Sequence, residues 1–238
     1  RSASFAPMYA FQVKQMLGGR RFRGAQRNKY LINSFDTMAQ SFDTDYRIKR
    51  ARIIAEEINK RINVSDKSNV LEFGCGTGLI TTNLIENINN LALVDSSEGM
   101  LEQLKAKLSN ISVNKQITVY NDLFSTDLAL YTYDLIYSSM VLHHIKSIGL
   151  FAQRFSKLLC QNGTLCIIDL LPVDKDYHIN EPDFEGYDGF EPKWLMNQLE
   201  SNGFVQKQYN VIYTGTKEIN GKVIEYSLFI LIATKSNN

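Results

Sequence analysis

Three glycines at alternate positions mark the stretch of this 238-residue sequence that is best suited to bind a ligand. Gly74, Gly76 and Gly78 follow the apolar residues 70–73 and precede a helical pattern. Glycine has no Cβ, so a turn built from it adopts positive φ and brings its N–H groups close to a ligand. The spacing predicts a ligand-binding turn at the carboxyl end of a buried strand. A nicotinamide dinucleotide is disfavoured, because its fingerprint requires glycine where this sequence has Leu79.

The same stretch resembles motif I of the class I S-adenosylmethionine-dependent methyltransferases, in which an acid precedes the pattern G-x-G-x-G. Glu72 stands in the place of the acid. The resemblance extends over roughly residues 35 to 235. It implies that Glu72, Gly74, Gly76 and Gly78 bind S-adenosyl-L-methionine, with S-adenosyl-L-homocysteine as the product.

The end of the second predicted strand resembles the ribose-binding part of the family. Asp95 follows the apolar run 91–94 and takes the position of the acid that accepts hydrogen bonds from both ribose hydroxyls. Ser96 lies beside it, and Met100 offers a polarizable side chain to the adenine. The alternatives are a helix N-terminal charge for Asp95 and core packing for Met100.

Two further strand ends complete the expected cofactor site. After the third strand, the resemblance implies that Asp122 accepts from the adenine amino group with Leu123 beside it. The alternative for Asp122 is a turn aspartate that bonds its own backbone. After the fourth strand, the resemblance implies that residues 138–140, Ser138 first among them, lie beside the methionine part of the cofactor.

His143 and His144 follow in a Val-Leu-His-His-Ile segment, which is similar to that of small-molecule members of the family. A hydroxyl, a carbon acid or a protonated amine needs a base before it accepts a methyl group, and histidine titrates near neutral pH. We therefore expect His143 and His144 to be catalytic, the alternative being loop residues satisfied by backbone carbonyls. Residues 138–141 lack the Asn/Asp-Pro-Pro segment of enzymes that methylate nucleic-acid bases, so a nucleic-acid acceptor is not expected.

Two other segments are expected to border the site. Residues 35–43 resemble the family's entry segment, a lid over the cofactor, with Phe42 in place of the more common tyrosine; ordinary packing is the alternative. Residues 171–194 form a long aromatic loop that we expect to build the acceptor pocket. Asp169 stands alone where metal-dependent members cluster carboxylates, so no metal is predicted.

The site needs a parallel sheet, and the rest of the sequence predicts one. Short apolar runs alternate with helical patterns, and Asn220-Gly221 is a hairpin signal near the carboxyl end. The expected helices cover 46–62, 77–86, 98–108, 149–159 and 192–202, and the expected strands cover 70–73, 91–94, 117–120, 134–137, 164–171, 205–213 and 223–233. The predicted fold class is α/β: a doubly wound, mostly parallel seven-stranded sheet with a C-terminal antiparallel hairpin, the Rossmann-like methyltransferase fold.

Composition agrees with one folded domain. The chain is 44% hydrophobic and 21% charged with net charge +1, and it has no apolar run of about 18 residues, so a membrane span is not expected. Its 3 cysteines form neither an even set nor a CxxC pair, which indicates a reducing, cytoplasmic setting. Residues 1–34 are predicted to be a basic tail outside the domain at 35–238. The tail is a transit peptide, a nucleic-acid arm or sequence foreign to the protein.

These features predict an enzyme that transfers a methyl group from S-adenosyl-L-methionine to the oxygen, nitrogen or carbon of a small-molecule acceptor by in-line displacement. Two alternatives stay open. One is a catalytically silent subunit that binds the cofactor, and the other is an RNA- or protein-directed methyltransferase that docks through the basic tail. The sequence does not indicate an oligomeric state.

Overall fold

The computed structural model describes residues 34–63, 69–88, 90–111, 115–130, 132–181 and 184–236. The basic segment at residues 1–33 lies outside the described residues, so the predicted domain boundary near residue 34 stays a prediction.

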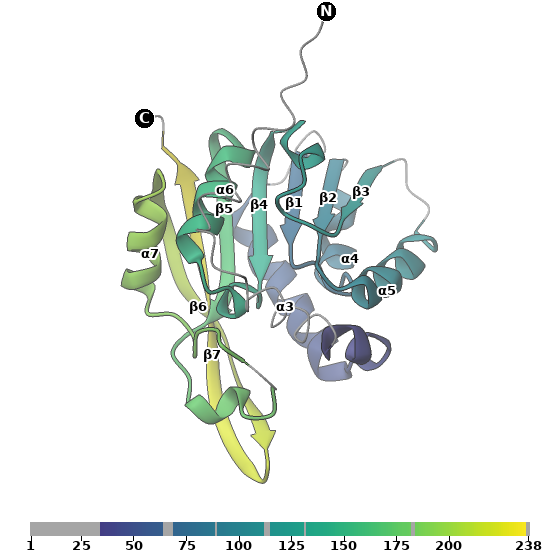
Figure 1. Cartoon of the computed structure of the whole chain (residues 1–238), viewed down its shortest axis with the longest axis vertical. Coiled ribbons are helices and arrows are strands. Elements are labelled where there is room, and N and C mark those ends of the chain that lie inside the picture. The colour runs from purple at the N-terminus through teal and green to yellow at the C-terminus, as the bar shows by residue number, and fades with distance from the viewer. Residues whose placement is uncertain are drawn as a thin grey trace, which may run out of the picture.

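A seven-stranded sheet in the order β3-β2-β1-β4-β5-β7-β6 is the centre of the fold (Figure 1). The first five strands pair in parallel, while β7 is antiparallel to both β5 and β6. The strands are β1 (Asn69–Phe73), β2 (Asn90–Val94), β3 (Gln116–Tyr120), β4 (Tyr133–Ser139), β5 (Leu159–Leu170), β6 (Phe204–Ile219) and β7 (Lys222–Lys235). The predicted fold class is confirmed.

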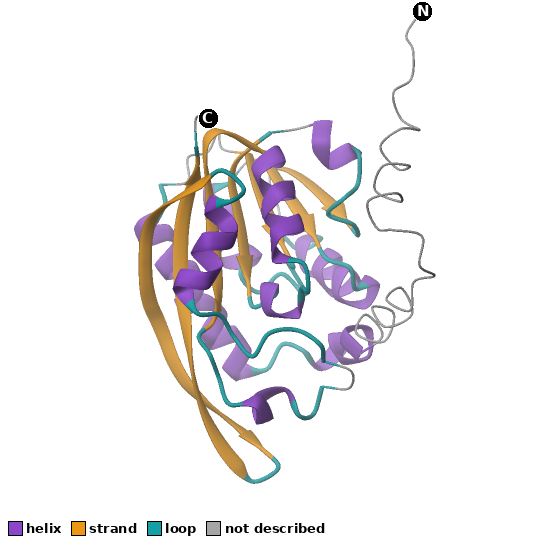
Figure 2. Cartoon of the chain, turned by 60° about the vertical axis from the view of Figure 1, so that its left-hand side comes forward, coloured by secondary structure: helices purple, strands orange, loops and turns teal. Residues whose placement is uncertain are grey.

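Helices cover both faces of this sheet (Figure 2). The core on one face joins the strands to α3 (Asp45–Arg61), α4 (Thr81–Leu84) and α5 (Glu98–Leu108). The core on the other face joins them to α6 (Ile148–Leu158) and α7 (Pro192–Glu200). Both faces are buried because side chains alternate along each strand, so Val70 and Leu71 belong to different cores.

The C-terminal hairpin is longer than the sequence predicts. Asn220 and Gly221 have φ of 52° and 78°, and they form the tight turn that Asn-Gly favours. From this turn the paired strands β6 and β7 run back into the sheet, and the turn end projects beyond the rest of the molecule (Figure 1).

The helix predicted at residues 77–86 is shorter in the structure. Residues 76–80 form turns, α4 begins only at Thr81, and the 3₁₀ turn η2 (Ile85–Asn87) follows it. Gly78 has φ of 80°, a left-handed conformation that a helix cannot include. The glycine turn therefore extends to residue 80.

Gly78→Ala is expected to destabilise the fold. A Cβ at Gly78 would lie 2.4 Å from Leu104 Cδ1 on α5, and the positive φ adds backbone strain. We expect the free energy of unfolding in urea to fall by roughly 2 to 4 kcal/mol. The matched control is Gly149→Ala in α6, where the nearest atom lies 3.9 Å away, and there the free energy should be unchanged or slightly higher. Equal effects of the two substitutions would contradict this account of the turn.

Candidate active site

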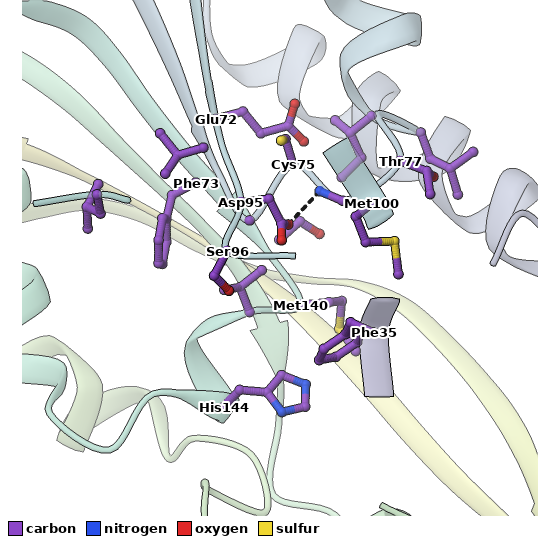
Figure 3. Close-up of a pocket in the computed structure, with 18 of the residues that line it drawn as sticks. Phe35, Glu72, Phe73, Cys75, Thr77, Asp95, Ser96, Met100, Met140 and His144 are labelled. Atoms are coloured by element: carbon purple, nitrogen blue, oxygen red, sulfur yellow. Dashed lines mark hydrogen bonds between the residues drawn. The ribbon is translucent and has the colours of Figure 1, made fainter. Parts of the chain in front are cut away.

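A cavity of about 410 Å³ opens at the carboxyl ends of β1, β2 and β4 (Figure 3). One part is bordered by the glycine turn and by the residues that follow β2 and β3: Gly74, Cys75, Gly76, Thr77, Asp95, Ser96, Met100, Asn121, Asp122 and Leu123. The other part is bordered by the entry segment, by α3 and by the loop after β4: Phe35, Phe42, Arg47, Arg50, Ala51, Ile54, Met140 and His144. This is the edge of the sheet where the sequence predicts a ligand.

The three glycines of the turn have different roles. All have positive φ: 75° at Gly74, 52° at Gly76 and 80° at Gly78. A Cβ on Gly74 would lie 2.0 Å from Val141, so this glycine allows close packing. A Cβ on Gly76 would meet nothing within 4 Å, although Gly76 borders the cavity. The missing side chain of Gly76 therefore leaves space to a ligand.

Asp95 is held by the backbone on both sides. Its Oδ2 accepts from the Gly76 amide at 2.8 Å, and its Oδ1 accepts from the Ser97 amide at 2.9 Å. Burial raises the pKa of the Asp95 carboxyl, and these two hydrogen bonds oppose the rise. Each oxygen of an ionised carboxylate has a second lone pair, so Asp95 still offers two adjacent acceptors to the cavity.

Glu72 lies beneath the turn with 2% of its surface exposed. Its Oε2 accepts from the hydroxyls of Thr81 and Tyr137, the latter at 2.7 Å. Burial raises the pKa of Glu72 to about 7 despite these two hydrogen bonds. The carboxyl borders the cavity and also connects β1, α4 and β4.

Four further predicted residues border the cavity: Ser96, Met100, Asp122 and Leu123. Met100 and Leu123 are buried and offer apolar surface. Asp122 Oδ1 accepts from the Phe124 amide at 2.9 Å, which is the local turn bond of the alternative. Asp122 is therefore a turn aspartate and a lining residue together.

Three predicted site residues do not border the cavity: Gly78, Ser138 and His143. Gly78 faces Leu104 on α5. Ser138 follows the strand alternation of Ile136 toward the α6 side, and its neighbour Ser139 reaches the cavity instead. These three residues therefore do not line the cavity directly, and their predicted roles toward the cofactor and the acceptor stay predictions.

His143 lies behind His144. Its side chain is 3% exposed, and its Nδ1 lies 2.6 Å from Asp169 Oδ1. His144 borders the cavity, and burial together with His143 lowers the pKa of His144 to about 3. The two rings are 4.1 Å apart between centroids. His144 is thus a neutral imidazole at neutral pH, and His143 supports it from behind.

A third histidine, which belongs to the loop predicted to build the acceptor pocket, completes a cluster. His178 lies on η5 (Lys175–His178) and stacks on Phe184 with centroids 3.8 Å apart. Its ring is 5.3 Å from that of His143, and its Nδ1 is 3.0 Å from Glu181 Oε2. No sequence signal points to this grouping, because Leu171 to His178 lies in a loop with no defined period. All 3 histidines of the chain meet here.

The described residues of the predicted acceptor loop, residues 171–181 and 184–194, do not border the cavity. Tyr177, His178 and Phe184 pack behind His143 and His144, and Phe190 stacks on Trp194 at the start of α7. This end of the cavity is bordered instead by α3 and the entry segment, and the place of the acceptor pocket stays a prediction.

The entry segment is fastened to both turns by two carboxylates. Asp36 accepts from the Ser97 hydroxyl and from the Gly99 amide, the latter at 2.9 Å. Asp43 accepts from the Thr77 hydroxyl and pairs with Lys107. Phe35 and Phe42, each next to one of these carboxylates in the sequence, border the cavity, and Phe35 meets His144 edge-on at 5.5 Å. The lid role of the segment stays a prediction.

The described residues contain neither a metal-binding cluster nor a membrane-spanning helix. No set of three or more His, Cys, Asp and Glu side chains there could hold a metal ion. Within the same ranges no helix is both long and apolar enough to cross a bilayer.

Comparison with known proteins agrees with the geometry. Residues 71–165 match the family model of a methyltransferase domain. An uncharacterized methyltransferase of Schizosaccharomyces pombe is 29% identical over 56% of this chain and 51% of its own length. A ubiquinone biosynthesis O-methyltransferase of Rickettsia canadensis is 26% identical over 62% of each chain. The chain spans about half the length of the first curated relatives that it matches.

Solved structures show the same fold. A crystal structure of a candidate S-adenosylmethionine-dependent methyltransferase from Listeria monocytogenes has a TM-score of 0.59 at 18% identity, covering 79% of this chain and 100% of the other. With the sheet order and the glycine turn, this shows the Rossmann-like fold of class I S-adenosylmethionine-dependent methyltransferases, and residues 71–165 match a methyltransferase domain.

Glu72→Gln is expected to change how stability depends on pH. Because the pKa of Glu72 is raised to about 7 in the folded state, the folded protein holds a proton there that the unfolded chain has lost. This contribution to stability is present at low pH and is lost as pH rises toward 7. Between pH 5 and 8 the wild type should lose roughly 2 to 3 kcal/mol relative to Glu72→Gln, measured by urea unfolding. A difference between the two proteins that stays constant across this range would contradict the burial of an uncompensated carboxyl.

Proposed function

We propose that this protein transfers the methyl group of S-adenosyl-L-methionine to a small-molecule acceptor by in-line displacement and releases S-adenosyl-L-homocysteine. One observation carries the proposal. One cavity is bordered at one end by the glycine turn and Asp95, and at the other end by an aromatic chamber formed by Phe35, Phe42, Met140 and His144 (Figure 3). Such a cavity suits two ligands that meet end to end. The relation to a ubiquinone biosynthesis O-methyltransferase supports a small acceptor.

The residues at the glycine turn fit the adenosyl part of the cofactor. Two vicinal ribose hydroxyls need two adjacent acceptors, which the oxygens of Asp95 supply. The space above Gly76 admits a ligand next to the backbone. Met100 and Leu123 offer apolar surface to a purine ring. Asp122 keeps one carboxylate oxygen for the adenine amino group, since only Oδ1 bonds the Phe124 amide.

The chamber beyond the turn suits the transfer step. Bound cofactor supplies a methyl group that the positive sulfonium has already activated, so the protein mainly has to align the acceptor and exclude water. Phe35, Phe42 and Met140 provide the apolar walls. Met140 has φ of 58°, a strained conformation for a side chain of this size that positions it at the cavity.

His144 is the polar group at this end of the cavity. Its pKa of about 3 keeps the ring neutral, so it can accept a hydrogen bond from a hydroxyl or amine of the acceptor. We assign His144 to orient this group as a hydrogen-bond acceptor, because a pKa of about 3 is too low for the general base that the sequence led us to expect. His143 is a positioning residue, because its ring is fixed by Asp169 and packs against that of His144.

Asp95→Ala is expected to weaken binding of S-adenosyl-L-homocysteine by about tenfold to a hundredfold, because charge-assisted hydrogen bonds to the ribose are lost. Calorimetric titration of the full chain measures this effect. The matched control is Asp134→Ala. Asp134 bonds the Asn69 amide at the opposite edge of the sheet, so its loss should leave the affinity unchanged. Equal affinities of the Asp95 variant and the wild type would disprove the ribose assignment.

Turnover tests the proposed reaction itself. Methyl-labelled S-adenosyl-L-methionine is incubated with the protein and a panel of phenols, amines and carboxylic acids, and S-adenosyl-L-homocysteine is measured. We expect product with at least one acceptor, and a much lower rate with His144→Ala at unchanged affinity for S-adenosyl-L-homocysteine. Tight binding without turnover on any acceptor would instead indicate a silent cofactor-binding subunit.

A further inference from the structure

Two arginines of α3 face the acceptor end of the cavity. Arg47 and Arg50 lie one helical turn apart, are half-buried, and both border the cavity. The Arg47 guanidinium carbon lies 4.2 Å above the ring of Phe42, and its Nη1 donates to the Phe42 carbonyl at 3.0 Å. Arg50 Nη1 donates to the Tyr226 hydroxyl at 3.3 Å. A guanidinium has five N–H donors, so most donors of each remain available.

Neither arginine has a carboxylate within ion-pair distance among the described residues. The two acids nearest to this region are engaged elsewhere. Asp43 pairs with Lys107, and Glu181 lies between His178 and Lys217 at 3.0 and 3.7 Å. Buried and half-buried charges are normally paired, because desolvation costs free energy. Two unpaired guanidinium groups beside a cavity are therefore an exception that calls for an explanation.

Lys217 is a further cation near the two arginines. Lys217 lies with its Nζ 4.2 Å from the centroid of the Tyr177 ring, and Tyr177 packs on Tyr226, the partner of Arg50. Burial lowers the pKa of Arg47 and of Lys217, and repulsion from Arg50 adds to both shifts. Lys217 is paired with Glu181, but Arg47 and Arg50 repel each other in the protein alone, and an anion between them would relieve this repulsion.

We propose that Arg47 and Arg50 bind an anionic oxygen group, a carboxylate or a phosphate, on the methyl acceptor. The proposal rests on the proposed function and names the class of its substrate. The planar guanidinium fork matches both groups in bidentate geometry. The acid group lies at α3, the body of the acceptor lies between Phe35, Phe42 and Met140, and the group to be methylated points to His144.

The test uses the full chain saturated with S-adenosyl-L-homocysteine and titrated with benzoate, phenyl phosphate and benzamide at constant ionic strength. The first two probes distinguish carboxylate from phosphate, and benzamide is a neutral analogue of nearly the same shape. We expect at least one anion to bind at least about tenfold more tightly than benzamide. Binding of neither anion below about 10 mM, or equal binding of the anions and benzamide, would overturn the proposal.

Variants locate the effect. Arg47→Gln, Arg50→Gln and the double substitution should each weaken binding of the anion by about tenfold or more. Binding of benzamide and of S-adenosyl-L-homocysteine should change less than about twofold. Arg52→Gln, which removes an exposed arginine of the same helix, is the matched control and should bind like the wild type. An anion affinity that all these variants retain would overturn the proposal.

The two proposals fail in different ways. If the wild type binds S-adenosyl-L-homocysteine but does not prefer the anions, only the substrate class is wrong. If the wild type does not bind S-adenosyl-L-homocysteine, the proposed function itself fails. The comparison of anions with benzamide on the wild type requires no variant, so it remains decisive if a substituted chain does not fold.

Discussion

The hydrogen bond from the Gly76 amide to Asp95 joins the turn after β1 to the end of β2, and the cavity depends on it. The amides of Gly74 and Cys75 donate to the Val94 carbonyl just before it, so the two chains remain joined beyond the last paired residues, Phe73 and Val94. This path requires positive φ at Gly74 and Gly76. Residues with a side chain would be strained there, and one at Gly76 would also occupy the ligand space.

Distant parts of the chain meet around this Gly76–Asp95 hydrogen bond and form the site. Asp36 and Asp43 fasten the entry segment to the turns after β2 and β1 and so close the cavity from above. The same segment leads into α3, which brings Arg47 and Arg50 to the cavity beside Phe42. Strand β5, which lies next to β4 in the sheet, supplies Asp169, and Asp169 fixes His143 behind His144. Burial makes each of these polar contacts stronger and an unpaired charge more costly.

The sequence predicted the parts of this arrangement that depend on local patterns. Strand order along the chain, the glycine turn, the position of Asp95 at a strand end and the Asn220-Gly221 hairpin all follow from short-range spacing. It did not predict which side of β4 faces the cavity: of the expected residues 138–140, Ser139 and Met140 border it and Ser138 does not. The alternation of side chains was visible, but its phase depends on which helix packs on which face.

Contacts between distant residues escaped prediction for a related reason. Arg47 and Arg50 belong to an amphipathic helix, and on such a helix charged residues are normally assigned to solvent. His178 belongs to the loop expected at the acceptor pocket, but a loop without a period gave no reason to place its ring against that of His143. His143 pairs with Asp169, which is 26 residues away in the sequence. This contact holds His143 behind the cavity, so only His144 of the two adjacent histidines borders it.

The most direct test of the central claim is a crystal structure of the full chain with S-adenosyl-L-homocysteine. The account predicts density for this ligand at the carboxyl ends of β1 and β2. Its ribose should contact Asp95, its homocysteine part should pass Gly76, and its sulfur should face Met140 and His144. Density at another place, or an adenosyl group that leaves Asp95 without a ribose contact, would contradict it.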